Sequence, residues 1–309
     1  MTAPALRPMT ATDWALLLLL SLLWGGSFLF GKVAAGALPS FTIVAGRVLF
    51  ALVTLWLVML VTGTALPRGG RHWVAILVMA LFNNVFPFTL IIWGQKQLGA
   101  GMASTLNAGV PFFTVLLAHV MTHDERLTPA KIMGTLVGLA GVTVLIGPET
   151  SGGHLLAAVS CLAGAVCYAL GGIYGRRFQR TGMNTMQLVF GQVLVAALIS
   201  VPLAAVIDEP WQLNMPDWKP LVSIAAMGIL STAVAYLIFF KLVMRTGATA
   251  ASLVTLMVPP SAMAMGALLL GEAITVMQIG GVALIAFGLA LTDGRIVGWA
   301  RRRLSGRRG

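Results

Sequence analysis

Long apolar segments, separated by short breaks that hold proline, glycine and polar residues, run along most of the chain. A helix needs about 20 mostly apolar residues to cross the hydrocarbon core of a bilayer, and the segments have that length. Breaks of this composition are typical of turns. The pattern therefore predicts ten membrane-spanning helices, at residues 14–35, 40–62, 73–95, 101–121, 130–147, 153–174, 184–207, 218–240, 248–270 and 274–292.

Two of these helices have a marked start. Thr128-Pro129 combines a hydroxyl that can accept a bond from the first turn with a proline at the first helical position. Thr275 stands in a similar place at the start of the last span. We therefore expect helices to begin directly after Thr128 and near Thr275.

The first apolar segment also resembles a cleavable signal peptide, because Arg7 precedes it and Ala35-Gly36-Ala37 follows it. Residues 14–35 are nevertheless long enough to span a bilayer. The segment also has a counterpart in the second half of the chain. We interpret it as the first membrane-spanning helix.

The second half of the chain repeats the first. The offset between matching positions drifts by only four residues, as shown by Trp24 and Tyr168 or Lys32 and Arg176 at 144, Arg47 and Gln192 at 145, Glu125 and Glu272 at 147, and Pro111 and Pro259 at 148. Each half holds five spans, an odd number, so the halves must lie upside down to each other. Inverted repeats with a site between them are a recurring plan of secondary transporters.

The predicted fold is an all-α membrane protein with ten transmembrane helices in two inverted five-helix repeats. The domains are a cytoplasmic N-terminal segment at 1–13, the first repeat at 14–147, the second repeat at 148–292 and a basic cytoplasmic tail at 293–309.

Composition supports this prediction. Charged residues make up 9% of the chain and hydrophobic residues 58%, whereas soluble domains average about 25% charged residues. The net charge of +11 does not indicate nucleic-acid binding, because the basic residues lie in short clusters between spans. The spacing of Cys161 and Cys167 is neither that of a zinc pair nor that of a redox motif. We expect no metal, cofactor or nucleic acid.

The basic residues also predict orientation. Of the 20 Lys and Arg residues, Arg47 lies inside a span, and only Lys32, Lys96 and Lys219 fall on the side opposite the termini. The other sixteen share the side of the termini. Because cytoplasmic loops collect Lys and Arg, both termini are expected in the cytoplasm.

The chain resembles the EamA family of the drug/metabolite transporter superfamily over residues 14–292. The resemblance is carried by Leu23-Trp24-Gly25-Gly26-Ser27-Phe28 with Lys32, Ala45-Gly46-Arg47-Val48-Leu49-Phe50, Leu98-Gly99-Ala100-Gly101-Met102-Ala103-Ser104 through Pro111, Asp124-Glu125-Arg126-Leu127-Thr128, Thr246-Gly247-Ala248 through Pro259-Pro260, and Gly271-Glu272-Ala273. It departs at Cys167-Tyr168, where a second tryptophan is expected. The resemblance implies a ten-helix carrier, and many carriers of this family export amino acids or other metabolites from bacteria.

Arg47 is the one charged side chain well inside a span. A charge there costs about 3 kcal/mol on insertion scales and is usually functional or paired. Its guanidinium has a rigid fork of donors that matches a substrate carboxylate. It can equally reach the membrane interface or bind backbone carbonyls at a neighbouring helix end. Both interpretations remain open.

Polar amides and aromatics inside the spans are candidates to line a cavity. Asn107 precedes Pro111 by four residues, so proline frees its carbonyl, and the counterpart Thr255 precedes Pro259 in the same way. Paired broken helices point to a transport site. The candidate cavity residues are Trp24, Ser27, Arg47, Asn83, Asn84, Phe86, Asn107, Tyr168, Gln192, Tyr236 and Thr255, with Trp93 and Gln187 as further members of the same residue types.

Other positions have less direct interpretations. His119, Glu125 and Glu272 are the candidates for proton coupling, because no Asp or Glu lies mid-span. Gly134, Gly138 and Gly141 share a helical face, as do Gly281 and Gly288, and such faces let helices pack closely within the fold or in a dimer.

The sequence thus predicts a secondary transporter of the bacterial inner membrane, monomeric or homodimeric, that exports amino acids or similar metabolites by alternating access. A multidrug or cation exporter of the same fold, a passive channel and an integral-membrane enzyme are the alternatives. An enzyme would need a cluster of acids, bases or metal ligands, and the spans hold one arginine and no carboxylate.

Overall fold

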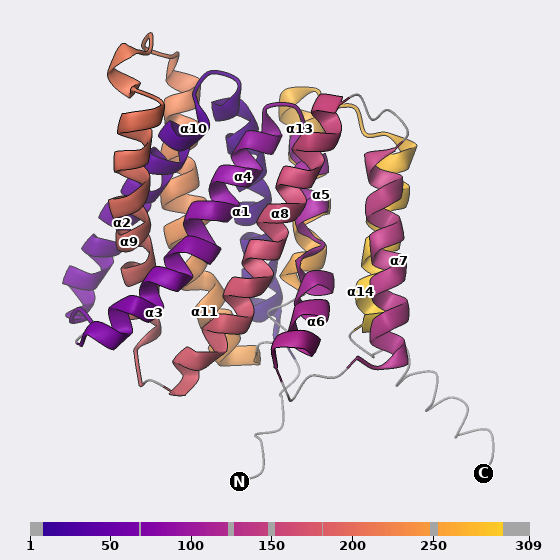
Figure 1. The fold of residues 1–309 in the computed structure, drawn as a ribbon, viewed down its shortest axis with the longest axis horizontal. Coiled ribbons are helices and arrows are strands. Elements are labelled where there is room, and N and C mark those ends of the chain that lie inside the picture. Colours follow the sequence, from indigo (N-terminus) through magenta and orange to yellow (C-terminus); the bar gives the residue numbers. More distant parts are fainter. Residues whose placement is uncertain are drawn as a thin grey trace.

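Ten apolar helical segments run roughly antiparallel through the computed structural model, which describes residues 9–67, 69–122, 127–147, 152–180, 182–247 and 253–292 (Figure 1). Within those residues, eight segments are long and apolar enough to cross a membrane, and two shorter apolar helices complete the ten spans. This arrangement confirms the predicted fold class. The spanning elements are α1 Ala11–Ala35, α2 Ser40–Thr62, α3 Gly70–Ala80, η1 Leu81–Val85, α4 Phe86–Gln95, α5 Ala100–Asn107, α6 Val110–Met121, α7 Pro129–Ile146, α8 Gly152–Gly175, α9 Thr185–Ile207, α10 Trp218–Gly228, η4 Ile229–Val234, α11 Ala235–Thr246, α13 Val254–Leu270 and α14 Val276–Thr292.

Helix starts follow local capping. The Thr128 side chain accepts from the backbone of Lys131, so α7 begins where expected. Thr275 and Gln278 exchange hydrogen bonds before α14, each side chain with the other's backbone N–H. Both predicted starts are confirmed. Satisfying the orphan N–H groups of a first turn in this way fixes where a helix begins.

The eighth span is longer than expected. The prediction ended it at residue 240, before Lys241, but α11 continues to Thr246. The extension is stabilised by an ion pair, because Arg245 Nε lies 2.7 Å from the buried Asp13 carboxylate at the start of α1. A charged last turn is compatible with a spanning helix once it has passed the hydrocarbon core.

The two ends of the helix bundle can be told apart by the chain segments that lie at each of them. The described chain begins and finishes at one end, called here the N/C end, and the turn at residues 96–99 lies at the opposite, distal end (Figure 1). The short helices η2 Arg176–Arg180 and η3 Pro210–Gln212 lie in connections at the N/C and distal ends respectively.

Helices α2 and α9 pack along each other and are bonded at both ends. At the distal end, Thr42 donates from its backbone N and its hydroxyl to one Asp208 carboxylate oxygen, at 2.7 and 2.9 Å. At the N/C end, Gln187 Nε2 donates to the Ala65 carbonyl at 2.9 Å. Thr42 and Gln187 are repeat counterparts at an offset of 145. The α2–α9 pair is therefore a doubly anchored unit that crosses between the two halves.

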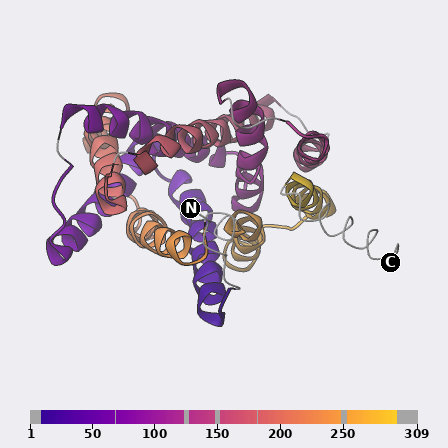
Figure 2. The same ribbon diagram turned by 90° about the horizontal axis from the view of Figure 1, so that it is seen from below.

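Helices α7 and α14 lie side by side at one edge of the molecule (Figure 2). Their glycine faces meet: a Cβ at Gly288 would lie 2.5 Å from the Gly134 carbonyl oxygen and 2.7 Å from the Gly138 nitrogen. Gly138 also leaves room for the Phe112 ring. The glycine faces thus serve packing within the fold, one of the two expected uses.

The close contact between α7 and α14 predicts how a substitution at Gly288 affects stability. Gly288→Ala should lower the free energy of unfolding by about 1–3 kcal/mol, because the added methyl meets backbone that cannot move aside. Gly280→Ala is the matched control on the same helix, where a Cβ meets only Val144, at 3.9 Å. Thermal unfolding of the purified protein would measure both. Equal melting temperatures for the two variants would contradict the close α7–α14 contact.

Candidate functional site

The helices lose their regularity near the middle of three spans. The fourth span is broken at Ala108 and Gly109, between α5 and α6, as the Asn107–Pro111 spacing predicted. The expected matching break in the ninth span is wrong, because α13 continues through Pro259 and Pro260. A transmembrane helix tolerates an internal proline where the freed carbonyl lies inside the protein. Pro259 frees the carbonyl of Thr255, which lines the cavity described below.

The irregularities that do match between the halves are two π-helical segments. η1 interrupts the third span and η4 interrupts the eighth. Leu81 and Ile229, the first residues of the two segments, are 148 apart, the same offset as Pro111 and Pro259. π segments occur mostly as short bulges in helices, frequently at functional sites. These two segments were not predicted from the sequence.

Each π segment contacts the matching residue of the α2–α9 pair. Arg47 Nε on α2 donates to Thr232 Oγ1 on η4 at 2.9 Å. On the other side, Gln192 Oε1 on α9 accepts from the Asn83 and Asn84 amides on η1, at 3.1 and 3.4 Å. Arg47 matches Gln192 at an offset of 145, and Asn84 matches Thr232 at 148. We call these five residues the polar centre.

Arg47 is buried, with 8% of its surface exposed, and lies next to aromatic and hydroxyl groups. Its guanidinium carbon lies 3.6 Å above the centre of the Phe88 ring, a cation–π contact. Tyr168 and Tyr236 are close enough to interact with it electrostatically. In the described part of the chain, no Asp or Glu pairs with it. The cation is held by its neighbours but is not neutralised.

Thr232 has a second bond that ties Arg47 to the π segment. Its hydroxyl donates to the Met227 carbonyl, five residues earlier, at 2.9 Å. A π bulge interrupts the regular α-helical bonds of the backbone. The one hydroxyl therefore satisfies a carbonyl of the irregular helix and accepts from the guanidinium, so it positions the Arg47 side chain.

A cavity of about 570 Å³ adjoins the polar centre. Nine of the eleven candidate residues line it, namely Trp24, Ser27, Arg47, Asn83, Asn107, Tyr168, Gln192, Tyr236 and Thr255. Phe28, Phe88, Phe239 and Phe240 are among the aromatic residues that line it as well. An apolar wall with a few convergent polar groups is typical of small-molecule sites.

Four residues that were expected in the cavity wall do not line the cavity, namely Asn84, Phe86, Trp93 and Gln187. Asn84 is fully buried behind Gln192 rather than in the cavity wall. Phe86 is 42% exposed and packs edge-on against Phe82, and Trp93 is 40% exposed. The physical reason is η1: one extra residue in a helical turn rotates the residues after it by about 100°. Gln187 caps the start of α9.

The cavity reaches the N/C end and is closed at the distal end. Arg176, at the end of α8, lines it and is exposed. At the other extreme of the cavity stands Gln95, which is 1% exposed and donates to the Phe28 carbonyl at 2.7 Å. The structure thus presents one conformation, with access from the N/C end.

The two proton-coupling candidates that the structure describes, His119 and Glu272, do not line the cavity. His119 is exposed on α6. Glu272 accepts from the backbone N–H groups of Ala100 and Gly101 at the distal end. Glu125 lies outside the described residues.

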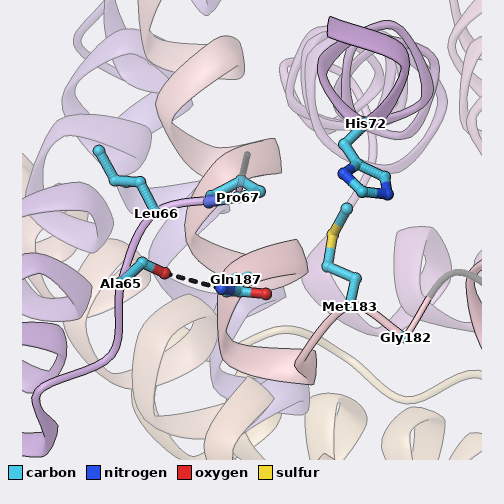
Figure 3. A pocket seen from close by; sticks show the side chains of 7 residues that line it. All are labelled: Ala65, Leu66, Pro67, His72, Gly182, Met183 and Gln187. Carbon is cyan, nitrogen blue, oxygen red and sulfur yellow. Dashed lines mark hydrogen bonds between the residues drawn. The ribbon is translucent and has the colours of Figure 1, made fainter. Parts of the chain in front are cut away.

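A second, smaller pocket of about 340 Å³ lies at the N/C end (Figure 3). The Gln187–Ala65 hydrogen bond crosses it, with His72 and Met183 on the other side. None of the eleven candidate cavity residues lines it. It belongs to the anchor between the α2–α3 connection and α9.

Comparison with known proteins agrees with this architecture. A model of the EamA-like transporter family matches residues 13–147 and again 155–292. The chain belongs to the EamA-like transporter family. Members of that family are membrane transporters, so this protein is not an enzyme.

Two relatives of this EamA-like chain are named as transporters, and each aligns with it over nearly its full length. It is 28% identical over 289 residues to a probable amino-acid metabolite efflux pump of Escherichia coli, covering 91% of this chain and 94% of the relative. It is 24% identical over 276 residues to the uncharacterized transporter YoaV of Bacillus subtilis, covering 87% and 92%. A crystal structure with 22% identity covers 92% of this chain and 98% of its own with a TM-score of 0.66, which supports the fold.

Sequence reasoning missed Thr232 and Phe88, which hold Arg47 in this EamA-like protein. The signal for Thr232 was present in the repeat, because Thr232 matches the candidate Asn84 at an offset of 148. Phe88 had no such signal, since its orientation depends on η1.

The role of Thr232 can be tested through stability. Thr232→Val keeps the shape but leaves the Met227 carbonyl and the Arg47 guanidinium each without a bond. We expect a loss of about 1–3 kcal/mol in the free energy of unfolding, measured by thermal unfolding. Thr232→Ser keeps the hydroxyl and should recover most of the loss. If the serine and valine variants are equally destabilised, the hydroxyl does not hold the site.

Proposed function

We propose that this protein exports small amino-acid-like metabolites across the bacterial inner membrane by alternating access, and that Arg47 binds the substrate carboxylate. The observation that carries this proposal is an uncompensated cation in the wall of a cavity of substrate size. The guanidinium presents several donors, of which only Nε has a hydrogen-bond partner among the described residues. A carboxylate fits such a fork of donors with two parallel bonds.

The same cavity offers unpaired acceptors for a substrate amine. Asn107 Oδ1 and Ser231 Oγ are buried and have no hydrogen-bond partner in the described structure, and both residues line the cavity. Ser231 directly precedes Thr232, the residue that holds Arg47. Buried acceptors without partners are rare because they cost free energy. An ammonium group, which has three donors, would satisfy them, so a zwitterion fits better than a simple anion.

A lipophilic-cation exporter is the weaker alternative. A desolvated cation needs a counter-charge, yet the charged residues that line the cavity, Arg47 and Arg176, are both positive. Aromatic faces such as Trp24 attract an ammonium, but they also serve an amino acid. The name of the Escherichia coli relative supports the amino-acid proposal.

The side of the membrane from which the cavity is accessible supports export. The basic residues favour a cytoplasmic N/C end, and the cavity is accessible from that end. The described conformation would then receive substrate from the cytoplasm.

Orientation is tested by labelling single cysteines in intact cells, after Cys161 and Cys167 are replaced by alanine. Asn214→Cys, in the distal connection between α9 and α10, should react with an impermeant maleimide from outside. Gly69→Cys, at the N/C end, should react only after the cells are opened. The reverse labelling pattern would overturn the proposed orientation. It would also overturn the inference that the described conformation receives substrate from the cytoplasm.

Cargo is tested with the purified protein in liposomes. Flux of a panel of amino acids should exceed that of their carboxamides, which are matched in shape but lack the carboxylate. Arg47→Gln should weaken amino-acid transport by about tenfold or more and remove the preference for acid over amide.

The variant must remain folded, as judged by yield and a single elution peak, so that lost transport is not lost protein. Transport of quaternary ammonium dyes without any amino acid would refute the cargo proposal. An unchanged preference for the acid in a folded Arg47→Gln protein would remove Arg47 from the site.

A further inference from the structure

The sealed distal end of the cavity is formed around the turn at residues 96–99. This turn joins α4, which ends at Gln95, to α5, which begins at Ala100. A helix carries partial negative charge at its C-terminus and partial positive charge at its N-terminus. The turn therefore presents both kinds of helix end within a few residues.

A cation contacts the C-terminal end of α4. Lys32, on α1, donates from Nζ to the Gln95 carbonyl oxygen at 2.9 Å. Gln95 returns a bond to α1 through its side chain, which donates to the Phe28 carbonyl at 2.7 Å. The end of α4 is thus bonded to α1 twice.

An anion contacts the N-terminal end of α5. The carboxylate of Glu272, in the connection between α13 and α14, accepts from the Ala100 N–H at 2.8 Å and the Gly101 N–H at 3.4 Å. Each contact has the sign that the helix dipole favours. Lys32 and Glu272 also attract each other electrostatically.

Glycines make room for this arrangement. A Cβ on Gly266 would lie 2.6 Å from a Glu272 carboxylate oxygen, and a Cβ on Gly99 would lie 2.8 Å from the same carboxylate. Gly31 likewise leaves room for the Gln95 side chain. The carboxylate lies between the start of α5 and Gly266 of α13, so it joins the turn to α13.

The repeat relates this closed end to the open one. The counterpart of Lys32 is Arg176, at an offset of 144, and Arg176 lines the accessible end of the cavity. The cavity is therefore closed at the end that holds Lys32 and open at the end that holds Arg176.

We propose that Lys32 and Glu272 form a charge clamp on the 96–99 turn, which keeps the distal end sealed and must release for that end to open. The clamp acts on the alternating access of the proposed function and does not depend on the cargo. Its release separates the turn from α1 and from the α13–α14 connection. Neutralising either charge therefore favours a conformation that is open at the distal end.

The test measures a distance across the clamp. Spin labels at Ala37→Cys and Gln97→Cys, both exposed positions, report the separation of α1 from the turn in full-length protein in nanodiscs, with Cys161 and Cys167 replaced by alanine. Glu272→Gln and Lys32→Gln should each raise the ratio of the long-distance to the short-distance population by about two- to fivefold. The ratio is measured without substrate, by double electron–electron resonance.

Lys96→Gln is the matched control, because it removes a positive charge from the same turn without touching the clamp. Distances in this variant should equal those of the parent. Unchanged distances in folded Glu272→Gln and Lys32→Gln proteins would overturn the clamp, and so would an equal change in Lys96→Gln. Failure of the cargo proposal appears separately, as lost acid-over-amide preference in liposomes.

Discussion

Backbone groups inside a bilayer have no water to bond, so each N–H and C=O must find its partner within the protein. This constraint fixes where the chain departs from a regular helix. The break at Ala108 and Gly109 and the segments η1 and η4 lie in spans whose residues line the cavity or form the polar centre. The Thr232 hydroxyl links this constraint to the candidate site. It donates a hydrogen bond to the Met227 carbonyl and accepts one from Arg47. The helix irregularity and the candidate site are therefore one feature.

Most of the fold could be predicted from the sequence, because the features that determine the helices are local in the chain. Apolar length gives the spans, and capping residues such as Thr128 mark helix starts. The broken fourth span followed from Asn107 and Pro111. The π segments were not predictable in this way, because a bulge leaves no mark on composition or hydropathy. Their consequence is a rotated helix face, and it explains why Phe86 was placed in the cavity although it lies outside. The polar pairs Asn83-Asn84 and Ser231-Thr232, at matching positions of the repeat, were the one trace of them.

The two halves share a plan but differ in charge. Arg47 and Gln192 lie on the α2–α9 pair, and each contacts the π segment of a neighbouring span. In one half the partner of the π segment is a cation, and in the other it is a neutral amide. A symmetric scaffold with one cation has a polarity that a symmetric pair of amides would lack. That polarity suits the zwitterionic substrate of the proposed function, to which Asn107 and Ser231 would offer their unpaired oxygens.

The position of the carboxylates bears on how transport is driven. No Asp or Glu lies mid-span, and Arg47 would repel a proton carried by a cationic group beside it. A proton relay through the cavity therefore lacks the carboxylates it would normally use. The described acidic groups that bond across helices lie at the ends of the bundle instead: Asp13 with Arg245, Asp208 with Thr42, and Glu272 with α5. These carboxylates thus lie at the ends of the bundle, whereas Arg47 is the cation beside the middle of the cavity. Under the proposed function, a driving ion would act on these contacts at the ends of the bundle, and the substrate would act on the polar centre between them.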